Sequence, residues 1–182
     1  MKKLVLVAAL GAISAAAFAA PETFNVEPTH TYPRFEYSHF GYSNQQQRFD
    51  KTSGKIVIDR AAKTGSVDVS IDTTSVNTGY ALFNQHIQAE DYFDTARYPA
   101  ITFKSTKVRF DGDKPVAVEG NLTIKGVTKP VTLTVTSFHS MPHPMLKKDA
   151  IGANAMTKVK RSEFNMGKNV PYVSDDVTLT IA

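Results

Sequence analysis

The stretch that decides the fold is residues 98–138, which read YPAITFKSTKVRFDGDKPVAVEGNLTIKGVTKPVTLTVTSF. In its second half apolar side chains fall on every second residue, at Val116, Val118, Leu122 and Ile124 and again at Val131, Leu133 and Val135. Because a strand directs alternate side chains to opposite faces, this period predicts strands with one apolar and one polar face. Asp-Gly-Asp at 111–113 and Lys-Gly at 125–126 supply turns. We therefore predict three antiparallel strands around an apolar interior.

Gly120 lies on the inward face of this stretch, between Val118 and Leu122. A glycine there leaves room that a side chain would fill, which indicates a cavity. A glycine inside a strand equally marks a bend in that strand. Both readings stay open, and Gly120→Leu is expected to block a cavity while straining a filled core.

Period-two alternation recurs on both sides of this stretch. The runs occupy residues 22–40, interrupted at Pro28, and residues 54–60, 66–72, 153–159 and 177–181. The polar segment 41–48 is typical of a loop. Strands at this spacing favour a sandwich or a barrel, and eight strands can close into a barrel that holds one small ligand.

One segment departs from strand spacing. Asn77 and Thr78 are acceptable helix caps, and apolar residues from Tyr80 onward then recur at helical intervals, with Phe83 and Ile87 four positions apart. We predict a short helical insertion around residues 78–93.

The first 19 residues predict a cleavable signal peptide. Lys2 and Lys3 precede an apolar run, residues 4–18, that is too short to span a bilayer as a free helix. Residues 17–19, Ala-Phe-Ala, fit the small-x-small cleavage pattern. The mature chain, residues 20–182, is predicted to be one exported domain, and no stable membrane insertion is expected because no later run is long and apolar enough.

The composition excludes several classes of site and partner. The chain has 21 basic and 17 acidic residues, and without Lys2 and Lys3 it has 19 basic residues against 17 acidic, a net charge of +2. No block of basic residues stands out, so nucleic acid is not an expected partner. The chain has no cysteine, which excludes disulfides, thiolate nucleophiles and cysteine-ligated metals.

Five segments resemble motifs of the YceI-like family, in order and at the family's spacing. They are the first strand pair (residues 30–41), the helix entry (75–78), Tyr-Pro-x-x-x-Phe-x-Ser-Thr (98–106), Gly-x-Leu-Thr-x-x-Gly-Val-Thr-x-Pro-Val (120–131), and Arg-Ser-Glu-Phe (161–164), which resembles the family's Arg-x-Asp-Phe. Residues 30–33 and 141–147 further resemble a proteobacterial branch that includes neisserial quinone-binding members. The family consists of exported bacterial lipid-binding proteins.

The resemblance implies an all-β fold, a lipocalin-like antiparallel eight-stranded β-barrel, located in the periplasm. It also implies a carrier that holds a long isoprenoid chain in an apolar tunnel, with no cofactor besides that bound lipid. The family's helix segment reads roughly Arg-Asp-x-His-Leu-Arg, whereas this chain has Phe83, Asn84 and Gln88 in place of the charged residues and keeps His86. Because arginine forks suit phosphate, we expect an isoprenoid quinone such as ubiquinone before a polyprenyl lipid. The sequence leaves a homodimer open.

The expected ligand-binding residues point inward on the predicted strands and helix. They are Phe35, Tyr37, His39, Phe40, Ile71, Phe83, His86, Ile87, Phe93, Ile101, Phe103, Leu122 and Leu133. The apolar members can equally be core, because apolar side chains face inward with or without a ligand. His39 and His86 lie on apolar faces and need a polar partner, either a head-group carbonyl or a backbone carbonyl.

Two alternatives come from other functional classes. The His139–Met145 loop alternates histidine and methionine, ligands that copper accepts, so a periplasmic copper-binding protein is the first. Pro142 and Pro144 in the same segment are equally typical of a bent loop without metal. The second is a lipid-ester hydrolase that acts through His86. The sequence has no Gly-x-Ser-x-Gly elbow and no metal site is predicted, so we expect no catalytic residues and no enzyme.

Overall fold

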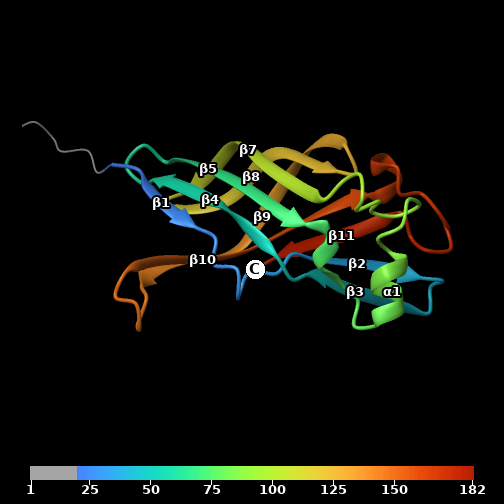
Figure 1. Cartoon of the computed structure of the whole chain (residues 1–182). Coiled ribbons are helices and arrows are strands. Elements are labelled where there is room, and N and C mark those ends of the chain that lie inside the picture. Colours follow the sequence, from blue (N-terminus) through green and yellow to red (C-terminus); the bar gives the residue numbers. More distant parts are fainter. Residues whose placement is uncertain (1–19) are drawn as a thin grey trace, which may run out of the picture.

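The computed structural model describes residues 20–182, so the predicted signal peptide lies outside the described residues (Figure 1). Eleven strands form one antiparallel sheet: β1 (Glu22–Asn25), β2 (Arg34–His39), β3 (Ser43–Phe49), β4 (Thr52–Asp59), β5 (Thr64–Asp72), β6 (Val76–Asn77), β7 (Ala100–Asp111), β8 (Lys114–Ile124), β9 (Val127–Pro142), β10 (Asp149–Lys160) and β11 (Asp176–Ile181). The helical elements are α1 (Ala81–His86) and two 3-10 turns (Thr73–Ser75 and Arg161–Phe164).

The sheet curls around one interior, which confirms the predicted antiparallel, lipocalin-like fold class (Figure 1). Its strands lie in the order β1-β4-β5-β7-β8-β9-β10-β11-β2-β3-β6, so β1 and β6 form its two edges. The structure has eleven strands where a barrel of eight was expected: the alternating runs contain nine of them, and β3 and the two-residue β6 come from segments without apolar alternation.

The three strands predicted from residues 98–138 are β7, β8 and β9, and they pair in sequence. The apolar alternation faces the interior except at Val116, which is 39% exposed. The pairing of β7 with β8 passes from Arg109↔Ala117 to Phe110↔Pro115, so Val116 has no partner. This bulge turns one member of the predicted apolar face outward.

Strand β3 corrects the expectation of a loop at residues 41–48. It pairs with β2 from Arg34↔Arg48 to His39↔Ser43, although most of its side chains are polar. On one face, the carboxylate of Glu36 accepts hydrogen bonds from the side-chain amides of Asn44 and Gln46. The two polar side chains thus hold the register that apolar alternation usually holds.

The helical insertion is present but its regular helix is shorter than expected. It begins at Ala81 after Tyr80, which makes no side-chain cap bond, so Asn77 and Thr78 are not the caps. Asn84 Oδ1 instead accepts from the Thr78 backbone N–H and hydroxyl, both at 2.7 Å. One helical residue thus holds the preceding turn.

Candidate ligand cavity

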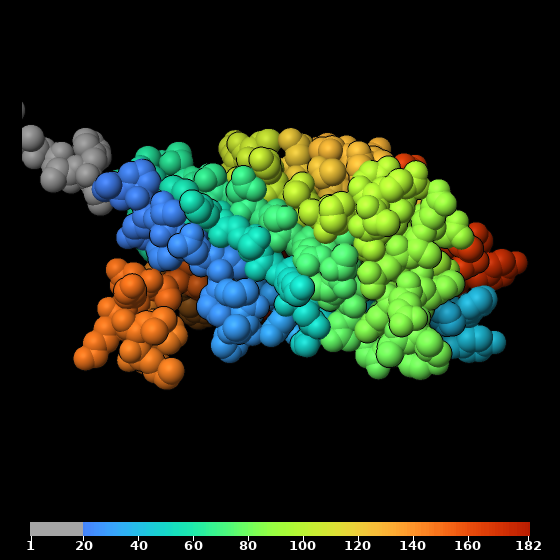
Figure 2. All heavy atoms as spheres, viewed as in Figure 1, coloured from blue at the N-terminus to red at the C-terminus, as the bar shows by residue number. Residues whose placement is uncertain are grey.

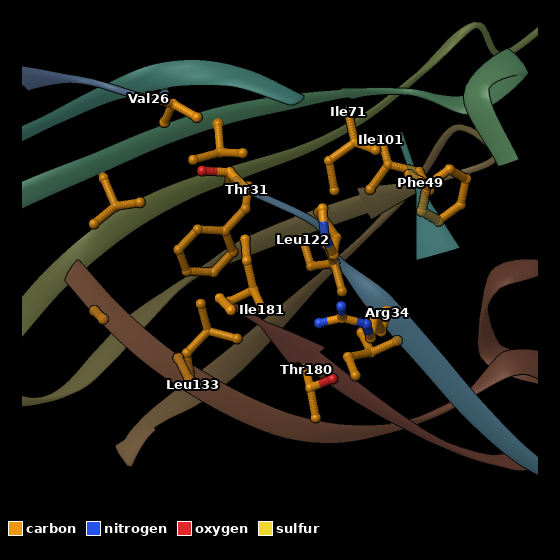
Figure 3. A pocket seen from close by; sticks show the side chains of 18 of the residues that line it. Val26, Thr31, Arg34, Phe49, Ile71, Ile101, Leu122, Leu133, Thr180 and Ile181 are labelled. Carbon is orange, nitrogen blue, oxygen red and sulfur yellow. The ribbon is translucent and has the colours of Figure 1, made fainter. Parts of the chain in front are cut away.

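The interior of the sheet is hollow. A cavity of about 1100 Å³ runs inside the barrel and is lined by apolar side chains from opposite walls, including Ile71, Ile101, Leu122 and Leu133 (Figure 3). It exceeds the usual small-molecule pocket of roughly 300–1,000 Å³. The cavity is therefore large enough for a long apolar ligand rather than a compact one.

The exposure of β9 shows why the interior is a cavity and not only a core. Val131, Leu133 and Val135 point inward and line the cavity, while Thr132 and Thr134 between them are exposed. The three apolar side chains are nevertheless only half-buried. These side chains pack against the buried core on one side and keep free surface on the side that faces the cavity.

One end of the cavity has polar side chains. Tyr37 and Arg161 line it there, and Gln47, which is 5% exposed, pairs with Phe35, two residues before Tyr37 on β2. Burial raises the pKa of the Tyr37 hydroxyl, against smaller opposing effects of the Gln47 side chain and the Arg161 charge. Tyr37 therefore stays protonated at neutral pH and can donate a hydrogen bond into the cavity.

Arg161 is occupied by the protein's own backbone. Its Nε donates to the Ser174 carbonyl at 2.8 Å, its Nη1 to the carbonyls of Met166 and Lys168, and its Nη2 to the Val173 carbonyl at 2.7 Å. Burial lowers the pKa of this guanidinium, although arginine stays charged at any physiological pH. Four of its five N–H groups are used, so it cannot offer a two-bond fork to a phosphate.

Lys168 and Arg34, which also border the cavity, differ in whether they form an ion pair. Lys168 forms an ion pair with Asp91, and this pair raises the pKa of Lys168. Arg34 borders the cavity and is exposed, and within residues 20–182 it forms no ion pair or side-chain hydrogen bond (Figure 3). Arg34 is therefore available to an anionic group, as is Lys148 in the loop at the opposite end of the cavity.

The opposite end of the cavity is formed by residues 23–31 and by the loop and strand at 143–151. In the first segment Glu27 accepts hydrogen bonds from the Thr29 hydroxyl and backbone N–H and from His30 Nδ1 at 2.7 Å. These bonds, led by the Thr29 hydroxyl, lower the pKa of Glu27 to about 2. The turn at this end is thus held by a carboxylate that stays ionised.

Of the thirteen residues expected to bind a ligand, eleven line the cavity. They are Phe35, Tyr37, His39, Ile71, Phe83, Ile87, Phe93, Ile101, Phe103, Leu122 and Leu133. Phe35, Phe49 and Phe93 also pack against one another, with ring centroids 5.4–5.7 Å apart. Contact of any of these residues with a ligand stays a prediction.

Phe40 and His86 are not among the residues that line the cavity, and their contact with a ligand stays a prediction. Phe40 follows the end of β2 with a φ of 53°, where the strand alternation stops, and it stacks on Tyr172 while 51% exposed. His86 ends the short helix and is exposed; its ring stacks on Phe83 and its Nε2 lies 3.2 Å from the Tyr92 hydroxyl. His86 therefore finds its polar partner in the Tyr92 hydroxyl, and Tyr92 itself lines the cavity.

The expected ligand-binding residues omitted three polar side chains that border the cavity: Arg161, Tyr92 and Arg34. Arg161 lies in the Arg-Ser-Glu-Phe segment that carries part of the family resemblance, so a signal for it was present. Tyr92 follows the regular helix in irregular turns, where no periodic pattern marks an inward face. Arg34 occupies an outward position in the β2 alternation and borders the cavity because β2 begins there.

The histidine–methionine loop has a structural explanation. His143 Nδ1 accepts hydrogen bonds from the backbone N–H groups of Met145 and Leu146, both at 3.2 Å. Residues 20–182 contain no group of three or more His, Cys, Asp or Glu side chains that could hold a metal ion. In the same range, no helix is long and apolar enough to cross a membrane.

Comparisons with known proteins agree on one family. A model described as "YceI-like domain" matches residues 24–182. Protein YceI of Escherichia coli O157:H7 is 36% identical over 186 residues, covering 100% of this chain and 96% of the relative. BcnA of Burkholderia cenocepacia has a TM-score of 0.71 at 26% identity, covering 83% of this chain and 93% of that one. A polyisoprenoid-binding domain from Saccharophagus degradans shares the fold, with a TM-score of 0.63 at 20% identity over 86% of this chain and 94% of that one.

Proposed function

This chain belongs to the YceI-like family, and on that premise we propose that it is a periplasmic carrier of one long isoprenoid lipid. The observation that carries the proposal is the apolar cavity of about 1100 Å³ inside the barrel. The domain from Saccharophagus degradans, whose likeness is one of fold, is described as polyisoprenoid-binding. Residues 1–19 act as the export signal, and the protein binds and releases its ligand without a catalytic step.

The binding energy comes from buried area. Burial of several hundred Å² of hydrocarbon at ~25 cal/mol per Å² contributes on the order of 10 kcal/mol before losses. Lost translational freedom and the ordering of side chains offset a good part of this. A micromolar affinity corresponds to about 8 kcal/mol net, so it requires a buried hydrocarbon area toward the upper end of this range.

A neutral head group, such as a quinone ring, fits the polar end best. Arg161 is engaged by backbone carbonyls and Lys168 by Asp91, so neither offers a free fork for a phosphate. The protonated Tyr37 hydroxyl can donate to a quinone carbonyl oxygen. Ubiquinone is therefore the first candidate for the head group.

One observation favours a second candidate, a polyprenyl phosphate. Arg34 borders the cavity with no ion pair in the described range, and its guanidinium would suit an anionic head group. The two candidates thus place the head group at different residues, Tyr37 for the quinone and Arg34 for the phosphate.

Competition binding separates the two candidates. Delipidated protein is titrated with a ubiquinone and with a polyprenyl phosphate of equal chain length. The proposal expects tighter binding of the quinone, weakened about five- to tenfold by Tyr37→Phe, the loss of one hydrogen bond, and unchanged by Arg34→Gln. Tighter binding of the phosphate, lost in Arg34→Gln but kept in Tyr37→Phe, would reverse the order of the candidates.

A further inference from the structure

A carrier of this kind must exchange its ligand with a bilayer, and the β9–β10 hairpin has the features of a membrane contact. We propose that the hairpin tip, residues 141–148, docks on a phospholipid bilayer that contains anionic lipids. This inference rests on the proposed function. Lining the cavity does not explain why apolar side chains of this tip are exposed to solvent. Docking on a bilayer gives them a partner.

The hairpin tip exposes three large apolar side chains. Met141 is 57% exposed, Met145 82% and Leu146 67%. Single exposed apolar residues are ordinary on protein surfaces, but three within six positions form a patch that calls for a partner. In Figure 2 this segment, in orange, stands out from the body of the molecule at the lower left.

The strand pairing shows why the tip projects. Strand β9 pairs with β8 only as far as Thr134↔Ala117, whereas its pairing with β10 continues to Pro142↔Asp149. Residues 135–142 therefore extend beyond the pairing with β8. The acidic turn between β7 and β8, with Asp111 and Asp113, belongs to the shorter neighbouring hairpin and does not reach as far along the strand direction.

The tip also borders the cavity. His143, Leu146 and Lys148 line it, together with residues 149–153 of β10. Leu146 is thus both an exposed residue and a lining residue. A lipid chain that leaves the cavity past this side chain would pass directly into a docked bilayer and would not cross water.

The tip is preformed, which lowers the cost of docking. The His143 N–H donates to the Lys148 carbonyl at 2.7 Å, and the Lys147 N–H donates to the His143 carbonyl at 2.9 Å. His143 Nδ1 accepts from the next two free N–H groups, those of Met145 and Leu146. Backbone groups that are already paired can enter the interface without losing hydrogen bonds to water.

The charges of the tip suit an anionic surface. Lys147 and Lys148 are exposed and form no ion pair within residues 20–182, and Asp149 follows them as one opposing charge. A lysine near an anionic leaflet is worth about 1 kcal/mol, so two lysines change partitioning by more than tenfold. Apolar side chains next to two adjacent cationic side chains are the combination that holds peripheral proteins at bilayer interfaces.

Vesicle flotation tests the proposal. The full mature protein is mixed with phosphatidylcholine vesicles with and without phosphatidylglycerol. We expect flotation that needs the anionic lipid and falls about tenfold in Met145→Ser/Leu146→Ser and in Lys147→Glu/Lys148→Glu. The matched control is Tyr42→Ser, which removes a side chain that is 92% exposed at the β2–β3 turn and should float as the parent does. Equal flotation of the parent and both tip variants, or an equal loss in Tyr42→Ser, would overturn the proposal.

Two further readouts keep this inference separate from the proposed function. Uptake of quinone from detergent solution is measured on Met145→Ser and Lys147→Glu, whose side chains do not line the cavity, and should be unchanged, while these variants should slow the transfer of quinone between vesicles. Flotation through the tip by a protein that takes up no quinone would leave docking intact and remove the carrier function. A dimer in sedimentation velocity that disappears in Met145→Ser/Leu146→Ser would show that the tip covers a second copy instead, and would overturn the membrane assignment.

Discussion

The ring of Phe103 occupies the space that a side chain at Gly120 would need. A Cβ atom on Gly120 would lie 2.5 Å from Phe103 Cζ and 2.6 Å from the Lys104 carbonyl oxygen. The two residues lie on the neighbouring strands β7 and β8, where Gly120 pairs with Ser105. The glycine therefore serves a close approach between the strands, and of the two readings left open by the sequence the one that has Gly120 mark open space does not hold.

Substitution at this glycine is expected to destabilise the fold. Gly120→Ala should lower the free energy of unfolding by about 1–3 kcal/mol, because the new methyl overpacks the contact with Phe103. Urea denaturation measures this. Gly152→Ala is the matched control, since nothing lies within 4 Å of its Cβ position, and it should change stability by less than about 0.5 kcal/mol.

The stability cost of Gly120→Ala should depend on the size of the side chain at position 103. In a Phe103→Leu background the cost of Gly120→Ala should shrink, with a coupling energy of about 0.5–3 kcal/mol. The Lys104 carbonyl keeps part of the cost in place. Strictly additive costs would contradict the assignment of Phe103 as the obstructing group.

A larger side chain at Leu133 should fill the cavity without unfolding the barrel. Leu133 points inward but is only half-buried, so Leu133→Trp has open space to enter. We expect ligand uptake to fall at least about tenfold, equivalent to about 1.4 kcal/mol of binding energy, with little change in thermal stability. Thr134→Trp places the same ring on the exposed outer face of β9 and should bind normally. Equal uptake by both variants would show that the ligand does not use this part of the cavity.

Arg161→Lys should loosen the segment that follows the 3-10 turn. A lysine has three N–H donors at one point and cannot span the carbonyls of Met166, Val173 and Ser174. We expect a loss of about 2–4 kcal/mol in the free energy of unfolding, since several buried acceptors lose a charged donor. Arg109→Lys, at an exposed ion pair with Glu119, is the control and should cost at most about 1 kcal/mol. Equal effects would mean that the Arg161 bonds contribute no more than a surface pair.

Glu27 should titrate far below an ordinary glutamate. Its pKa in the folded state is about 2 against a usual 4.5, so the bonds to Thr29 and His30 are fully present above pH 4.5 and are lost as the pH falls through about 2. Carboxyl-carbon NMR measures this directly. Thr29→Val removes the hydroxyl, the largest cause, and should raise the pKa toward 4.5. A Glu27 pKa near 4.5 in the parent would contradict the geometry of this turn.

Much of the fold follows from the alternation of apolar and polar side chains along the strands. The strand that lacks this alternation is held by contacts with a neighbouring strand. Strands β7, β8 and β9 were predictable because apolar residues alternate along them. Strand β3 was not, because its polar side chains are stabilised by Glu36 on the neighbouring strand, a contact that no local pattern reveals. Pairing between strands, rather than composition, decides such a segment.

The site was predictable where residues continue a regular element and not where an element ends. Eleven lining residues sit within strands or near the short helix, whereas Phe40 and His86 sit at the ends of β2 and α1, where alternation or helical spacing stops. Arg161 shows a further limit, because its role depends on four carbonyls of a later irregular segment. Such partners become visible only when the chain is folded.

Native mass spectrometry of the mature protein tests the central claim most directly. The protein is delipidated, incubated with a ubiquinone, and compared with its Leu133→Trp and Thr134→Trp variants. The carrier function predicts one quinone per chain in the parent and in Thr134→Trp, and almost none in Leu133→Trp. A parent protein that takes up neither the quinone nor a polyprenyl phosphate of equal length would contradict it.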